Sequence, residues 1–70
     1  MAEIRAEMVA NVFQVTAAPG ERVDADATLL ILESMKMEIP VRTEEPGSIV
    51  SIDVAEGDVV QEGDLLAVLE

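Results

Sequence analysis

The chain has 70 residues, with 15 Asp and Glu against 4 Lys and Arg, a formal net charge of −11, and neither cysteine nor histidine. This composition excludes disulfides, thiolate metal sites and histidine-based catalysis, and the acidic balance argues against nucleic acid or an anionic membrane surface as a partner. Half of the residues are apolar and only Phe13 is aromatic, so the core must be aliphatic. We therefore expect one small domain over residues 1–70, with little room for a buried pocket.

Strand patterns fill the first half of the chain. Apolar and polar residues alternate over residues 2–7, which predicts a half-buried strand. Val12, Phe13 and Val15, with polar residues between them over 11–16, suggest a second strand. Pro19 and Gly20 indicate a turn, which is followed by an extended pair at 22–23 and a second turn. The apolar run at 28–33 predicts a buried strand.

The second half of the chain follows the same plan. Extended segments separated by turns are predicted at residues 38–43, 48–54, 59–60 and 65–69. No segment of helical length has a 3.6-residue apolar period. The sequence thus predicts an all-β domain of roughly eight short strands arranged in two sheets.

An internal repeat accounts for this similarity. A shift of 37 positions aligns residues 1–33 with residues 38–70 without a gap. Eight positions are identical in the two copies: Arg5/Arg42, Glu7/Glu44, Ala18/Ala55, Gly20/Gly57, Val23/Val60, Leu29/Leu66, Leu32/Leu69 and Glu33/Glu70. Two copies are too few for a solenoid but suit two interlocked halves related by a pseudo-twofold axis. Chance similarity between two acidic, valine-rich segments is the alternative.

Only residues 34–37 belong to neither copy, so the repeat predicts a hairpin turn there. The segment lacks the Asn-Gly or Gly that normally marks a two-residue turn. Lys36, the only lysine, stands in this turn between Met35 and Met37. Bulky residues in a tight turn imply strain, which is often tolerated where a side chain must be presented.

Lys36 has a plain alternative interpretation, as a solvated charge paired with Glu33 or Glu38. Met35 and Met37 have one too, as packing against the body, although methionine is also common on adaptable binding surfaces. The chain offers Ser34 no histidine or cysteine with which to form a catalytic site. No metal-ligand spacing or phosphate-binding glycine run is present. We therefore expect no enzyme activity, and Lys36 is better interpreted as a residue that is acted upon.

The segment from Glu33 to Pro40, Glu-Ser-Met-Lys-Met-Glu-Ile-Pro, resembles the biotinyl-attachment motif of biotin-dependent carboxylases, which centres on Met-Lys-Met. The glycine-containing segments at 47–50, 56–60 and 62–66 are similar to the rest of that pattern, so the resemblance covers nearly the whole chain. It implies a flattened β-barrel or sandwich of two quasi-symmetric four-stranded antiparallel sheets. The attachment lysine of such a domain lies on a hairpin at one end.

The resemblance also implies a function as a carrier. A biotin protein ligase would attach biotin to Lys36 as an amide. A biotin carboxylase and a carboxyltransferase on other chains would then load and unload CO₂, commonly for an acyl-CoA acceptor. The residues implied in ligase recognition are those that flank the lysine: Glu33, Ser34, Met35, Met37 and Glu38. No signal peptide or membrane span is visible, so the expected location is the cytoplasm.

The chain departs from the family pattern at Ala10 and Asp26, where glycine is frequent in the family. The compact turn at 18–21 leaves no room for the thumb loop of some bacterial acetyl-CoA carboxylase carriers, which weakens a role in fatty-acid synthesis. Two other functions stay open. A lipoyl carrier would share the fold and the tip lysine, although its usual tip is Asp-Lys-Ala. An unmodified acidic interaction module would keep Lys36 as a free amine.

Overall fold

The computed structural model describes residues 1–70 and consists of strands and turns, without a helix. The strands are β1 (Ala2–Arg5), β2 (Ala10–Val15), β3 (Arg22–Val23), β4 (Thr28–Ser34), β5 (Met37–Arg42), β6 (Gly47–Ile52), β7 (Val59–Val60) and β8 (Leu65–Leu69). The all-β class predicted from the sequence is confirmed. The ends of several strands differ from the prediction by one or two residues, for example at β6, which was expected at 48–54.

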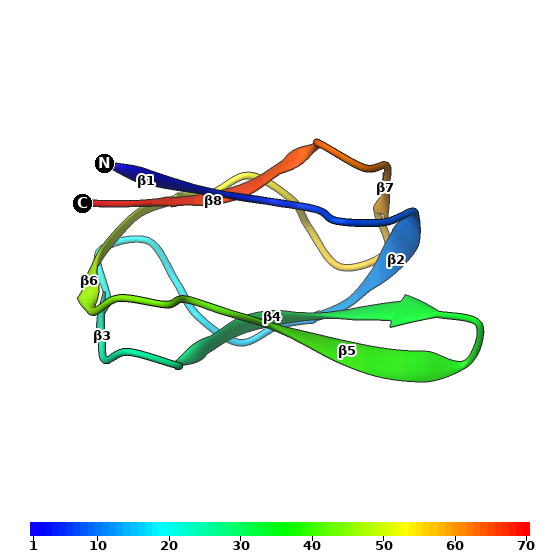
Figure 1. The fold of residues 1–70 in the computed structure, drawn as a ribbon, viewed down its shortest axis with the longest axis horizontal. Coiled ribbons are helices and arrows are strands. Elements are labelled where there is room, and N and C mark those ends of the chain that lie inside the picture. The colour runs from blue at the N-terminus through cyan, green and yellow to red at the C-terminus, as the bar shows by residue number, and fades with distance from the viewer.

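Two four-stranded antiparallel sheets make up the fold, with strand orders β1-β8-β6-β3 and β5-β4-β2-β7. The molecule measures 30 × 17 × 17 Å along its principal axes. Both termini lie together at one end of the long axis, near β3 and β6, and the β4–β5 hairpin protrudes at the other end, beside β2 and β7 (Figure 1).

The two sheets are quasi-symmetric. Adding 37 to each residue number takes β1 to β5, β2 to β6, β3 to β7 and β4 to β8. The order β1-β8-β6-β3 thereby becomes β5-β4-β2-β7, which is the order of the second sheet. The 37-residue correspondence therefore relates each sheet to the other. The predicted pair of quasi-symmetric four-stranded sheets is confirmed.

The core consists of two aliphatic clusters, each built from residues of both copies of the repeat. The first contains Ala6, Ala10, Val12, Leu30, Leu32, Val60 and Leu66, and the second contains Ala17, Val23, Leu29, Ile49, Ala67 and Leu69. Five members of the first cluster map onto five of the second under the same 37-residue shift. Burial of these aliphatic side chains is the main stabilising contribution available to a chain with one aromatic residue.

Irregular pairing explains why the apolar alternation is imperfect. The register shifts between Val12 and Gln14 in β2 and at the equivalent point between Ile49 and Ser51 in β6. Such a bulge adds one unpaired residue to a strand, which inverts the alternation beyond it. The extra residues are Phe13 and Val50, and both are exposed.

The turns around the core are stabilised by hydrogen bonds to carboxylate side chains and contain residues with positive φ angles. Glu21, Asp58 and Asp64 each accept a hydrogen bond from the backbone N–H three residues earlier. The fourth equivalent turn has Asp26 at φ 66°, where its counterpart Gly63 has φ 91°. Aspartate tolerates the left-handed region better than most residues, so this departure leaves the turn intact. Ala10, the other departure, is buried in β2 and pairs with β7 in register.

Candidate functional site

The hairpin between β4 and β5 has a two-residue turn. Ser34 pairs with Met37, and the two residues between them, Met35 and Lys36, have φ angles of 54° and 65°. Positive φ at both central residues is the mark of a type I′ turn, whose twist matches that of the flanking strands. The hairpin turn therefore lies over residues 34–37.

This turn forms against the local preference of its residues. Left-handed backbone costs an ordinary L residue about 1–2 kcal/mol, and neither Met35 nor Lys36 is glycine or asparagine. The strands determine the register instead, because Leu30 and Leu32 of β4 are buried in the core and a shift by one residue would expose them. Packing in the body thus imposes the strained turn.

The side chains of the turn stand away from the body. Met35 is 91% exposed and Met37 is 64% exposed, and Lys36 is exposed as well. Met35 therefore does not pack onto the core. The only ion pair of the chain joins Arg5 to Glu3 at 2.8 Å, so Lys36 is paired with neither Glu33 nor Glu38. Lys36 is thus exposed, and the β4–β5 hairpin that carries it lies at the far end of the long axis from the termini (Figure 1).

Glu33 and Glu38 face each other across the hairpin one pair below Ser34 and Met37. Residues directly opposite in an antiparallel pair have Cβ atoms roughly 4.5–5.5 Å apart, and like charges there are destabilising. Four of the six motif residues thus come from the last pairs of β4 and β5, and Met35 and Lys36 form the turn between them. The structure brings together the residues that the sequence motif singled out, and it adds the information that the two carboxylates are cross-strand neighbours.

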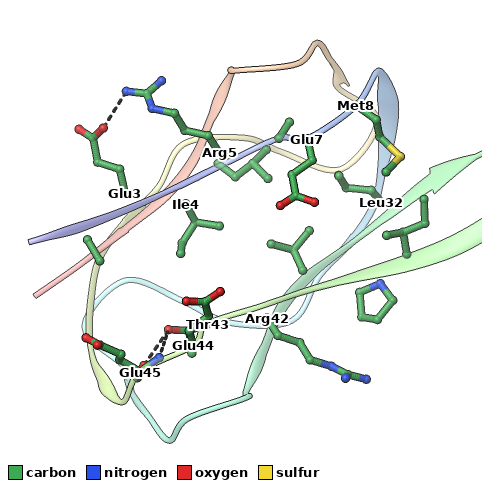
Figure 2. Close-up of a pocket in the computed structure, with 16 residues that line it drawn as sticks. Glu3, Ile4, Arg5, Glu7, Met8, Leu32, Arg42, Thr43, Glu44 and Glu45 are labelled. Atoms are coloured by element: carbon green, nitrogen blue, oxygen red, sulfur yellow. Dashed lines mark hydrogen bonds and ion pairs between the residues drawn. The ribbon is translucent and has the colours of Figure 1, made fainter.

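A second feature was not anticipated from the sequence. An open groove with a volume of about 540 Å³ runs between the edge strands β1 and β5. Ile4 and the carboxylate of Glu7 point into it, and Leu32 lies at its hairpin side (Figure 2). The groove is open to solvent rather than a buried pocket, and Lys36 does not line it. It arises because β1 and β5 are edges of different sheets and do not pair with each other.

Other kinds of site are absent. No group of three or more acidic, histidine or cysteine side chains is placed to hold a metal ion. The structure contains no helix that could span a membrane. The exposed lysine on its turn is therefore the feature in which the local backbone, the exposure and the sequence motif coincide.

An exposed lysine on a tight turn, mounted at the end of two quasi-symmetric four-stranded sheets, defines the class of small carrier domains that take biotin or lipoate. Residues 2–69 match the family model described as "Biotin-requiring enzyme", and the chain belongs to this family. Members of this class carry a group and are not catalytic themselves, so the expectation of no enzyme activity is confirmed. The chain is 47% identical over 67 residues to a "Biotinylated protein TB7.3 homolog" of Mycobacterium leprae, covering 96% of this chain and 94% of that protein.

Solved structures agree with this assignment. The urea carboxylase of Kluyveromyces lactis contains a region that superposes with a TM-score of 0.92 at 32% identity. That region covers 99% of this chain but only 6% of the carboxylase. The lipoyl domain of the 2-oxoglutarate dehydrogenase complex from Azotobacter vinelandii superposes with a TM-score of 0.80 at 29% identity, over 96% of this chain and 95% of the domain. The chain is thus similar to both kinds of carrier.

Proposed function

We propose that the chain is a biotin carrier, in which Lys36 is biotinylated by a biotin protein ligase. The observation that carries this proposal is the Lys36 amine, exposed and unpaired on a type I′ turn between two exposed methionines. The similarity to a protein named as biotinylated supports it. The Met-Lys-Met sequence favours biotin over lipoate, because lipoyl domains usually have Asp-Lys-Ala at this place.

The residues present suit a group held through a single amide bond. The Lys36 ammonium group would first lose one proton to solvent, and its Nζ would then attack the carboxyl carbon of biotin, activated with ATP as an acyl adenylate. The bond from that carbon to the adenylate oxygen would break, AMP would leave and a second proton would go to solvent. The product is a neutral amide, so the positive charge of Lys36 would be lost. Biotin, when attached, supplies a ureido nitrogen that takes up and releases a carboxyl group. No side chain of the chain encloses Lys36, so an attached arm would be free to reach sites on other proteins.

The chain itself would contribute a mount and a recognition surface. The rigid hairpin holds the attachment point at one end of a body 30 Å long, and tethering raises the effective concentration of the carried group at each partner site. Glu33, Ser34, Met35, Met37 and Glu38 would be read by the ligase. Their clustering around the turn means that one enzyme surface could contact all five.

The partners in this proposal are a biotin carboxylase and a carboxyltransferase. The similarity to a segment of a urea carboxylase supports partners of the carboxylase class. An acyl-CoA is the acceptor that we propose. A lipoyl carrier is the second candidate, because the Azotobacter lipoyl domain matches nearly the whole chain.

In vitro biotinylation tests the proposal. Purified chain, biotin protein ligase, biotin and ATP are incubated, and the intact mass is measured. We expect one biotin adduct on the wild type and none on Lys36→Arg, which keeps the charge and the turn. A parallel reaction with a lipoate ligase provides the comparison. Modification by the lipoate ligase alone would show that the attached group is lipoate and not biotin. No modification by either ligase would reject the carrier proposal.

A further inference from the structure

Because the fold is quasi-symmetric, the exposed residues of one sheet can be compared with those at the equivalent positions of the other sheet. The two sheets have equivalent strands, so a surface property present in only one half is not required by the fold. Apolar side chains exposed on the outer face of the hairpin-bearing sheet include Val9 at 61%, Phe13 at 48% and Val59 at 66%. Their counterparts in the other half are Pro46, Val50 and Arg22. We name Val9, Phe13 and Val59 the shoulder.

These three residues share one face of the sheet. Ala10 and Val60 are buried in the core, so their neighbours Val9 and Val59 point outward. Asn11 pairs directly with Val59 and Ala10 with Val60, so Val9 lies on the diagonal from Val59, and the exposed Asn11 lies between Val9 and Phe13 along the chain. Phe13 is the bulged residue of β2, further along the same strand.

The shoulder is continuous with the attachment hairpin. One cross-strand row runs from Val59 through Asn11 and Glu33 to Glu38. Because β2 runs antiparallel to β4, Val9 lies at the hairpin end of β2. β2 and β7 accordingly lie at the same end of the molecule as the hairpin (Figure 1).

The opposite half lacks this combination. The equivalent row begins at Arg22, which pairs with Ser48, and it lies at the end that carries the termini. Phe13 and its counterpart Val50 are both exposed, but two exposed valines accompany the bulged residue only beside the hairpin, since the counterparts of Val9 and Val59 are Pro46 and the charged Arg22. Exposed apolar residues scattered singly need no explanation, whereas a group of them beside a functional turn indicates an interaction surface.

The charged residues around the shoulder indicate what kind of partner surface would be complementary to it. Glu33, Glu56 and Asp58 lie around the shoulder, the latter two in the turn that leads into β7. Arg5 donates hydrogen bonds to Glu3 and to the carbonyl of Gly63. Arg22 lies in β3, and Arg42 pairs with Thr28 at the end of β5 away from the hairpin turn. A complementary partner would therefore present an apolar patch bordered by lysine or arginine.

We propose that the shoulder is the docking surface for the ligase that modifies Lys36. This inference rests on the proposed function. An enzyme that acts on the bare amine must bring its active site to within one lysine side chain of the turn. Its surface then has to cover the residues beside the hairpin. A partner that acts on the end of an attached arm can work at a distance from the body.

Steady-state kinetics of biotinylation, with the chain as the varied substrate, tests this inference. The test variants are the double substitution Val9→Ser/Val59→Ser and the single substitution Phe13→Ser. The matched control is Val50→Ser, which makes the same kind of change at the bulge of the other sheet. We expect KM to rise about tenfold for the double variant, with kcat nearly unchanged, and Val50→Ser to stay close to wild type. Circular dichroism establishes that each variant is folded.

The outcomes separate the two proposals. A wild type that is not biotinylated rejects the proposed function itself. A biotinylated wild type with KM unchanged in the shoulder variants overturns the ligase surface alone. Unchanged biotinylation with slower carboxylation of the biotinylated variants would overturn it as well, and would assign the shoulder to the carboxylase. An equal rise in KM for Val50→Ser would show that the effect is not specific to this face.

Discussion

The strained turn makes a prediction about stability that can be worked out from its geometry. Met35 and Lys36 occupy the left-handed region at φ 54° and 65°. The double substitution Met35→Asn/Lys36→Gly installs the residues that a type I′ turn prefers. The side chain of Met35 is 91% exposed, so almost no packing is lost with it.

The expected gain is a difference of two effects. The left-handed backbone costs an L residue about 1–2 kcal/mol, while glycine loses more conformational entropy on folding, by roughly 0.5–1 kcal/mol. Asparagine recovers part of the cost at position 35. We therefore expect the free energy of unfolding to rise by about 1 kcal/mol, or a Tm increase of roughly 4–8 °C for a domain of this size.

Thermal and urea denaturation followed by circular dichroism measure the effect. Lys36→Ala is the control, because it removes the same charge and side chain but keeps a Cβ in the left-handed region. We expect it to lie near the wild type. A double variant no more stable than the wild type would refute the account of a strained turn. An equal gain in Lys36→Ala would attribute the gain to the side chain instead of the backbone.

Two further substitutions test the fold around the site. Gly47→Ala would place a Cβ 2.7 Å from the backbone oxygen of Glu70, so we expect a loss of about 1–3 kcal/mol in the free energy of unfolding, measured by urea denaturation. Unchanged stability would mean that the end of β8 moves freely. Glu38→Gln removes the like-charge pair with Glu33, and we expect a gain of roughly 0.2–1 kcal/mol that shrinks as salt is added. A loss of stability would show that the two carboxylates do not repel each other in the folded state.

The sequence predicts much of this fold because its two halves carry the same information. The apolar alternation locates the strands, and the segments at 22–23, 59–60 and 65–69 agree with the observed β3, β7 and β8. The repeat also places the hairpin, which turn propensity alone would miss. Met35 and Lys36 are poor residues for a type I′ turn, and only the register of β4 against β5 requires them to adopt it.

Other features depend on contacts between segments distant in the chain. The bulges that expose Phe13 and Val50 come from pairing with a neighbouring strand, and the broken alternation at these positions does not by itself identify a bulge. The groove between β1 and β5 exists because these strands are edges of separate sheets. The shoulder likewise becomes visible only when the register places Val59 opposite Asn11, on the diagonal from Val9.

The most direct test of the carrier function is the intact mass of the protein purified from its native host, with peptide mapping of Lys36. We predict a mass increase equal to one biotin amide, located on Lys36 and absent from Lys36→Arg expressed in the same host. A lipoyl adduct on Lys36 would contradict the choice of biotin while keeping the carrier function. A bare lysine in the host would contradict the function itself and favour the unmodified interaction module.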